Sequence, residues 1–275
     1  YDPRIDVVKN LIGNTPKLDG KTPRHHQDVV LDKLPHRSRR PEYSVYVNTI
    51  KTLDAVLPYA DRVYFEHGDR IEEAREMCSA KGVECVDLLP RFDALDELSS
   101  DGPVMVNGPG QYRLCRNAPR IYASSVFNCY NSWFPLDVYQ TTLSVELSRN
   151  EVSDLIAHSP GRFEVMGFGR TELMYTRDPG LESGAIVDEK EASFPVYRDR
   201  RGFAHILNSV DLFLLDSVEE LGRSGVQSIG LDLRKRPPVL AKAVGQYIRQ
   251  PDPKLRAKLE EMCGGFPHGL YRRGL

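Results

Sequence analysis

From Tyr43 onward, short runs of apolar and β-branched residues alternate with longer stretches of helical periodicity. Runs of the first kind predict strands, and apolar residues three or four positions apart predict helices. Ile50, Leu53, Val56 and Leu57, for example, would share one face of a helix. The regular succession of strands and helices favours βα units around a parallel sheet.

The pattern predicts eight strands, at residues 44–47, 62–66, 84–89, 103–107, 120–124, 142–147, 163–168 and 227–233. Helices are expected after most of them, at 50–57, 70–80, 93–98 and 238–248, with further short helices after the Gly-Pro-Gly at 108–110 and from residue 150. Eight is the number of strands that closes a parallel barrel. We therefore predict an α/β fold of the (β/α)8 TIM type, with an open doubly wound sheet as the alternative.

Two segments interrupt this pattern. Residues 169–211 are too long for an ordinary connection, and they contain short apolar pieces that predict an inserted hairpin segment after the seventh strand, over the barrel mouth. Residues 1–42 hold Gly, Pro and basic residues without a long periodic run, which indicates a linker or the tail of a preceding domain. The predicted barrel therefore occupies residues 43–275.

Composition and charge narrow the range of functions. The chain has 275 residues, enough for one barrel of roughly 250 residues. Lys plus Arg is 37 and Asp plus Glu is 39, so the chain has no global attraction to nucleic acid or anionic membranes, although a local basic patch is still compatible with RNA. No apolar run approaches the ~20 residues of a membrane span, and we expect a cytoplasmic protein with no membrane partner. Because the chain begins with Tyr1 rather than Met, we also expect it to be part of a longer protein.

Cysteine and histidine spacing gives no sign of a metal site. The five cysteines form no closely spaced pair, so we expect free thiols in a reducing compartment: Cys78, Cys85, Cys115, Cys129 and Cys263. His25, His26 and His36 have no carboxylate or cysteine at ligand spacing beside them, and a solvated loop explains them.

Polar residues follow most of the predicted strands, and the carboxyl ends of strands form the functional face of a parallel barrel. The candidate binding residues are Asn48, Asn107, Asn128, Arg170, Tyr175, Asn208, Asp232 and Arg234. The catalytic candidates are Glu66, His67 and Glu146. Amides and arginines suit a polar or anionic ligand, because the guanidinium fork matches carboxylate and phosphate oxygens.

Several of these candidates also have a structural interpretation. Glu66 and His67 could be a general acid/base pair or a hydrogen-bonded strand end. Asp232 and Arg234 alternate on one strand and could form a structural ion pair. Arg170 follows a Gly-Phe-Gly turn, where glycine lets the backbone approach a ligand closely.

Two further residues near strand ends are explained by structure at least as well as by function. Asn208 and Ser209 could cap a helix that starts near Val210. Cys129 is the thiol placed best for chemistry, but a buried free thiol is the plainer interpretation.

Several segments together resemble the peptidase U32, or collagenase-like, family. They are GFGRTELMYTRDP at 167–179, FPVYRDRRGFAHILNS at 194–209, LFLLDSVEELGRSGVQSIGLDLR at 212–234 and PHGLYRRGL at 267–275, with VFNCYN at 126–131 and SVEL at 144–147. Their order and spacing extend the resemblance over residues 43–275. The early GNTPKL stretch at 13–18 is similar to the end of an extra middle domain in longer members.

The resemblance implies a barrel that forms the C-terminal part of a two-barrel protein, with the N-terminal barrel as its partner. Members of the family are described as collagen-degrading peptidases, or as oxygen-independent hydroxylation factors that act on ribosomal RNA, transfer RNA or quinone precursors. The hydroxylating members hold an iron–sulfur cluster on four cysteines.

This sequence departs from the family's cysteine pattern. Asp178-Pro179 stands where the family often has Cys-Pro, and residues 200–204 stand where it often has a cysteine. We therefore expect no cofactor in this chain, and place any iron–sulfur cluster in the missing N-terminal part.

The resemblance leaves three functions open. The first is a C-terminal barrel that supports hydroxylation of RNA or of a small molecule by binding the substrate or the partner domain. The alternatives are a collagenase-like peptidase and a non-catalytic assembly domain. The sequence does not decide whether the chain is itself an enzyme.

Overall fold

The computed structural model describes residues 40–91, 101–130, 137–199 and 201–266. The chain divides into two compact units, Tyr1–Asp32 and Lys33–Leu275, and the described residues belong to the second. Nearly all of the predicted linker at 1–42 and all of the predicted helix at 93–98 lie outside the described residues. The first strand begins at Glu42, close to the predicted domain boundary.

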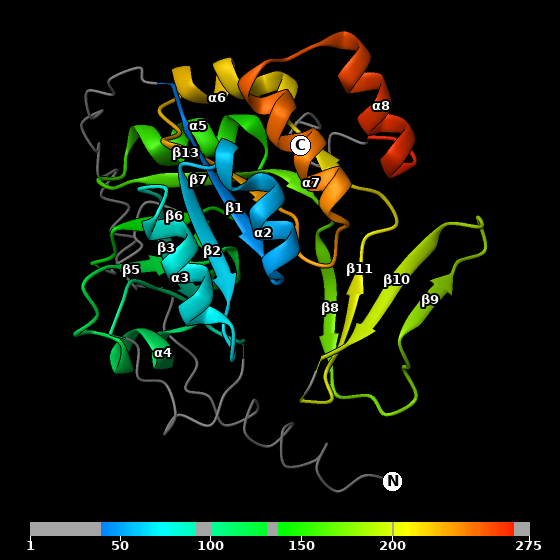
Figure 1. The fold of residues 1–275 in the computed structure, drawn as a ribbon, viewed down its shortest axis with the longest axis horizontal. Coiled ribbons are helices and arrows are strands. Elements are labelled where there is room, and N and C mark those ends of the chain that lie inside the picture. The colour runs from blue at the N-terminus through cyan, green and yellow to red at the C-terminus, as the bar shows by residue number, and fades with distance from the viewer. Residues whose placement is uncertain (1–39, 92–100, 131–136, 200, 267–275) are drawn as a thin grey trace, which may run out of the picture. The chain divides into compact units, whose positions relative to one another are not determined.

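Eight parallel strands close into a barrel, which confirms the predicted (β/α)8 fold and excludes the open sheet (Figure 1). The strands are β1 (Glu42–Val47), β2 (Arg62–Glu66), β3 (Glu84–Leu88), β4 (Val104–Val106), β5 (Ile121–Ala123), β6 (Gln140–Thr142), β7 (Phe163–Gly169) and β13 (Ser228–Asp232). Each strand pairs in parallel with the next, and the pairing of β13 with β1 completes the circle.

Helices follow most of the barrel strands. They are α2 (Ile50–Val56), α3 (Ile71–Ser79), α4 (Pro109–Leu114), α5 (Arg149–Ala157), α6 (Val218–Arg223), α7 (Pro238–Arg249) and α8 (Pro253–Cys263). Local sequence explains where some of them begin and end. Ser148 and Glu151 form a capping box at the start of α5. Asp252 accepts hydrogen bonds from the first backbone amides of α8, which ends at Gly264 in the left-handed conformation.

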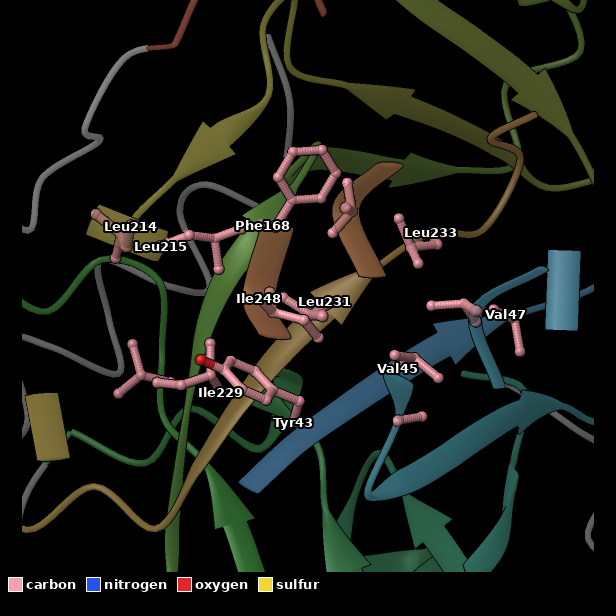
Figure 2. Close-up of a cluster of buried hydrophobic side chains, with 14 of the residues drawn as sticks. Tyr43, Val45, Val47, Phe168, Leu214, Leu215, Ile229, Leu231, Leu233 and Ile248 are labelled. Atoms are coloured by element: carbon pink, nitrogen blue, oxygen red, sulfur yellow. The ribbon is translucent and has the colours of Figure 1, made fainter. Parts of the chain in front are cut away.

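The main hydrophobic core lies between the barrel and its helices. Tyr43 and Val45 of β1 and Ile229 and Leu231 of β13 gather on the same side of the sheet as Ile248 of α7 (Figure 2). Because successive side chains of a strand point to opposite faces, this outward row leaves the intervening residues to fill the barrel interior.

The barrel interior is partly polar. Glu164 is fully buried and accepts hydrogen bonds from Gln140 (3.1 Å), Thr142 (3.0 Å) and Ser228 (2.8 Å). It also accepts one from the Tyr46 hydroxyl. Burial and the nearby Glu164 carboxylate raise the pKa of Tyr46 well above its usual value, so this phenol remains a donor.

The sixth strand lies earlier than predicted. The alternation of Leu143, Val145 and Leu147 suggested a strand at 142–147, but β6 ends at Thr142. Leu143 and Leu147 are instead buried in the core from a loop. The alternation of apolar residues therefore indicated buried positions here but not a strand. As a result, Glu146 lies in the loop after β6 and not in a strand.

Between β7 and β13 the chain inserts a four-stranded antiparallel sheet, which is larger than the predicted hairpin. Its strands are β8 (Glu172–Thr176), β9 (Gly184–Val187), β10 (Ser193–Arg198) and β11 (Ala204–Leu207), in the order β8-β11-β10-β9 (Figure 1). The backbone amide of Asn208 donates to the carbonyl of Thr171 (2.8 Å), so the insert leaves and re-enters the barrel at one point.

The prediction of a helix near Val210 is wrong. After the insert, the short strand β12 (Leu212–Phe213) pairs antiparallel with the end of β7. The Asn208 side chain instead accepts from the backbone amide of Ser209 (2.9 Å) at the base of the insert.

Candidate functional site

A cavity of about 360 Å³ opens at the carboxyl ends of the barrel strands. Its lining comes from the strand ends, from the loops after β3, β5 and β6, and from strands β8, β10 and β11 of the insert. A volume of this order is typical of pockets for small ligands. The position agrees with the functional face that the sequence predicted.

Strand alternation places Glu66 and Asp232 at this cavity. Glu66 follows Arg62 and Tyr64 at every second position of β2, and the buried side chains of both residues point into the barrel. Asp232 continues the inward row of Ser228 on β13 in the same way. Both carboxylates are therefore the last inward-facing side chains at the carboxyl ends of their strands, and both line the cavity.

Asp232 holds the Arg234 guanidinium through two hydrogen bonds and also accepts one from the Arg234 backbone amide (3.1 Å). The Arg234 Nε lies 2.9 Å from Oδ1 and Nη2 lies 2.6 Å from Oδ2. Burial alone would lower the pKa of Arg234, but the attraction of Asp232, with smaller contributions from Tyr197 and Glu66, raises it well above its usual value. The two residues form the ion pair that the sequence allowed, and Arg234 stays charged at the edge of the cavity.

Glu66 differs from the other cavity carboxylates. It is half-buried, and within the described parts of the chain its carboxylate has no hydrogen-bond or ion-pair partner. It is close enough to influence the ionisation of Tyr197 and Arg234. The phenol of Tyr197 likewise has no hydrogen-bond partner among the described residues.

A chain of charged groups joins the insert to the barrel. Arg91, after β3, pairs with Glu172 of β8. The other oxygen of Glu172 lies 2.6 Å from Nδ1 of His205, and Nε2 of His205 lies 3.4 Å from Asp199. Tyr197 stacks on the His205 ring at 4.2 Å with an interplanar angle of 8°.

Sequence patterns did not reveal this network, because it depends on the register of the insert. His205 of β11 lies opposite both Tyr175 of β8 and Tyr197 of β10. Tyr175 is 30 positions from His205 along the chain, and no local motif marks either partner. Strand alternation in an assumed antiparallel sheet is the one signal that could have grouped them.

Tyr175 was predicted as a binding residue and does line the cavity. Its ring stacks on Phe203 at 4.6 Å and meets His205 edge-on at 4.5 Å, and its hydroxyl lies 3.3 Å from Asp199. Burial acts to raise the pKa of Asp199, but the backbone amides of Phe203 and Arg201, together with His205, outweigh it and lower the pKa. Tyr175 is therefore held beside a carboxylate that is charged at neutral pH.

Arg170 lines the cavity but already has a carboxylate nearby. Its Nε lies 3.9 Å from Oδ2 of Asp211, which is fully buried and also lies 2.6 Å from Arg236. Burial raises the pKa of Asp211 even though both arginines act to lower it. The two arginines thus surround one buried carboxylate, which positions Arg170 at the cavity.

The remaining predicted residues at the cavity differ in how many hydrogen bonds their side chains already make. Asn107 is fully engaged, since its Nδ2 donates to the carbonyl of Leu89 (2.6 Å) and its Oδ1 accepts from Ser124 (2.8 Å). Asn128 is exposed, adopts the left-handed conformation with φ of 53°, and has an amide side chain without a partner among the described residues. Glu146 is exposed and accepts from the hydroxyl of Tyr130 (2.6 Å).

Three predicted residues do not line the cavity: Asn48, His67 and Asn208. Asn48 accepts from the backbone amide of Lys235 (3.1 Å). His67 binds Asp87 through Nδ1 (2.9 Å). Because His67 and Glu66 are consecutive, they point in opposite directions, and the structure does not bring them together as an acid/base pair.

The five cysteines are buried and form no disulfide, as predicted, and Cys129 does not line the cavity. Across the described ranges, no three His, Cys, Asp or Glu side chains are grouped closely enough to hold a metal ion. The described helices include none with the length and apolar character needed to cross a bilayer.

Comparisons with known proteins identify no family for this chain. No model of a known protein family matches the sequence, and no curated protein matches it. Among solved structures, the chain is similar to the spore cortex-lytic enzyme SleL of Bacillus cereus, with 9% identity over 72% of each chain and a TM-score of 0.39. It is also similar to orotidine 5'-phosphate decarboxylase from Pyrococcus horikoshii OT3, with 12% identity over 74% of this chain and 99% of that chain and a TM-score of 0.38.

A third similar structure is a chitinase from Chromobacterium violaceum ATCC 12472, with 8% identity over 80% of this chain and 98% of that chain and a TM-score of 0.38. At such identities and scores, these likenesses give no argument about the reaction. The function has to be argued from the cavity itself.

Proposed function

We propose that this chain is a substrate-binding barrel that takes a small polar molecule, or the polar part of a larger one such as RNA, into the cavity at the barrel mouth. The observation that carries the proposal is a cavity of about 360 Å³ that is lined by both the barrel and its insert. In a barrel of this type the carboxyl ends of the strands are where ligands bind.

Polar groups without partners support this proposal. The Glu66 carboxylate, the Tyr197 hydroxyl and the Asn128 amide line the cavity without a hydrogen-bond partner among the described residues. Buried polar groups in proteins are normally paired, so the half-buried Glu66 and Tyr197 are groups that a ligand in this concave site would satisfy. The exposed Asn128 amide can add a hydrogen bond at the rim of the cavity. The groups around them are fixed by ion pairs and ring stacking, which favours binding because little side-chain entropy is lost.

The sequence resemblance to the peptidase U32 family supports a more specific role. On that basis the chain is the C-terminal barrel of a two-barrel protein, and it binds the substrate of an RNA or small-molecule hydroxylation. Any iron–sulfur cluster would belong to the N-terminal barrel, which is the proposed partner. In this role the cavity positions the substrate for chemistry that the partner performs.

The test is ligand-dependent thermal stabilisation of the purified chain. The panel contains nucleosides, short oligoribonucleotides, amino acids, amines and carboxylic acids. A ligand at 100 times its Kd should stabilise the chain by about 2.7 kcal/mol. The Ser125→Trp variant, which places a large ring in the cavity, should lose this effect, and Ser125→Ala should keep it.

Other outcomes would point to the alternative functions. Cleavage of denatured collagen by the chain, abolished by Glu66→Gln, would establish a peptidase. Tight binding of the N-terminal half, with no ligand from the panel and no effect of Ser125→Trp, would leave only an assembly role.

A further inference from the structure

We infer that the ligand carries a positively charged nitrogen group, an ammonium or a guanidinium, which pairs with Glu66 inside the cavity. The inference rests on the proposed function and specifies the chemical class of the ligand. From sequence, the arginines at the strand ends suggest an anionic ligand. The structure shows that Arg91 and Arg234 are already paired with carboxylates of the chain.

Two of the three arginines at the cavity are already held by carboxylates. Arg91 pairs with Glu172, and Arg234 is held by Asp232 at 2.6 Å. Arg170 makes no hydrogen bond through Nε within the described parts of the chain, and it lies 3.9 Å from the buried carboxylate of Asp211. An anionic ligand would have to compete with Glu172 and Asp232 for Arg91 and Arg234, and with the weaker attraction of Asp211 for Arg170.

The carboxylates at the cavity are also satisfied, with one exception. Glu172 is shared by Arg91 and His205, and Asp232 is bound by Arg234. Asp199 accepts backbone amides, and Glu146 accepts the hydroxyl of Tyr130 (2.6 Å). Glu66 alone of the described cavity carboxylates has neither a hydrogen bond nor an ion pair.

The surroundings of Glu66 favour a cation. Asp232 and Arg234 neutralise each other, so the charge of Glu66 is the one left uncompensated among these three residues. Glu66 is half-buried, and a charge pair that is shielded from water is stronger than a pair on an open surface. The Tyr197 hydroxyl offers a second acceptor, and the Tyr197 ring is fixed between His205 and Lys235, whose Nζ lies 5.0 Å from the ring centre.

The experiment compares a cation with its neutral isostere. 1-Butylguanidine and 1-butylurea have nearly the same shape, but an uncharged urea group replaces the guanidinium in the second. Pentylamine and the uncharged 1-pentanol form an additional pair that tests the ammonium alone. Binding is measured by thermal shift and calorimetry on the purified chain.

We expect 1-butylguanidine or pentylamine to bind at least tenfold more tightly than its neutral counterpart. Glu66→Gln should remove at least tenfold of that affinity. Glu66→Asp, which keeps the charge, should preserve the preference for the cation and shows that the site is still folded. Glu182→Gln changes an exposed glutamate outside the cavity and should bind as the unmodified chain does.

A further comparison distinguishes a cationic group that belongs to a polypeptide from one that belongs to a free small molecule. If the natural ligand is polypeptide, acetyl-Gly-Arg-Gly-amide should bind more tightly than 1-butylguanidine, and if it is a free small molecule the order should be reversed. Either order supports the inference when the binding depends on Glu66.

Two results would overturn the inference in distinguishable ways. In the first, citrate, phosphate or a neutral nucleoside binds to the cavity, and Ser125→Trp abolishes that binding. If the cations then bind equally to Glu66→Gln and to the unmodified chain, the proposed function stands and the inference of a cationic ligand is wrong. If no probe of any charge binds, both proposals fail.

Discussion

At the scale of single residues, Gly169 shows how the end of the seventh strand reaches the site. Its φ is 120°, a conformation that other residues rarely adopt, and a Cβ there would lie 2.5 Å from the carbonyl oxygen of Asp232. The close approach of these backbones sets Arg170 and Asp232 beside each other at the cavity. The prediction of a turn at Gly-Phe-Gly is wrong, because these residues are the last three of β7. The glycine did indicate a close approach of the backbone, but not that its neighbour would be another strand.

We predict that Gly169→Ala destabilises the chain by about 3 kcal/mol, because it adds backbone strain and an overlap with a carbonyl that cannot move freely. The matched control is Gly110→Ala. Gly110 lies in α4, and a Cβ at this position would have nothing within 4 Å, so alanine should stabilise the chain by about 0.5–1 kcal/mol. Urea denaturation measures both, and equal stability of the two variants would contradict this explanation.

At the scale of secondary-structure elements, the amino ends of the barrel strands are joined by charge. Arg62 at the start of β2 lies 2.9 Å from Glu42 of β1 and 3.0 Å from Glu84 of β3. Arg120, just before β5, lies 2.7 Å from the same Glu84, and Tyr122 donates its hydroxyl to it. This end of the barrel is therefore held by paired charges, in contrast to Glu66 at the carboxyl end, which has no hydrogen bond or ion pair among the described residues.

The charge on Glu84 should make stability depend on pH. Burial acts to raise the pKa of Glu84, but Tyr122, Arg62 and Arg120 outweigh it, and the folded value is below the usual 4.5. A lowered pKa of an acid stabilises the fold at pH values above 4.5, and this contribution is lost as the pH falls through the folded value. The unmodified chain should therefore lose stability as the medium becomes more acidic than pH 4.5.

Glu84→Gln tests this dependence. We expect it to be less stable by about 2 kcal/mol at neutral pH, since it leaves Arg62 partly unpaired. The difference should shrink in acid, where Glu84 of the unmodified chain is protonated. Chemical denaturation at several pH values measures it, with exposed Glu182→Gln as the control, and a difference that stays constant with pH would show that the charge of Glu84 is not responsible.

At the scale of the whole described unit, the insert is a second layer of structure on a complete barrel. All eight barrel strands pair without it, and it joins the barrel at Thr171 and Asn208, whose backbones lie 2.8 Å apart. Its own strands supply Glu172, Tyr197 and His205 to the cavity. Barrel and insert therefore have separable roles, in folding and in completing the site.

We predict that replacing residues 172–207 with a Gly-Gly link leaves a folded barrel without the cavity. Because Thr171 and Asn208 are already neighbours, the link requires no change in the barrel. Thermal unfolding followed by circular dichroism should remain cooperative. The affinity for any ligand found for the intact chain should fall at least tenfold. Retention of full affinity would show that the insert does not belong to the site.

The sequence alone determined most of the barrel, because its evidence is local. Period-two and helical patterns depend on residues a few positions apart, so seven of the eight strands lie close to their predicted positions. The sixth was misplaced because Leu143 and Leu147 are buried from a loop, and burial rather than strand structure produced their pattern. The same local logic placed Glu66 and Asp232 at strand ends, where both line the cavity.

Only the tertiary structure decided which of these charges are free. Pairs such as Arg91 with Glu172 and Arg170 with Asp211 join residues that are 81 and 41 positions apart, and their geometry follows from barrel closure and from the register of the insert. No pattern in the sequence reports whether a carboxylate has found a cation across the barrel. The sequence thus determined where the polar side chains gather, and the folded chain determined which of them pair with one another, because ion pairing depends on distances in space.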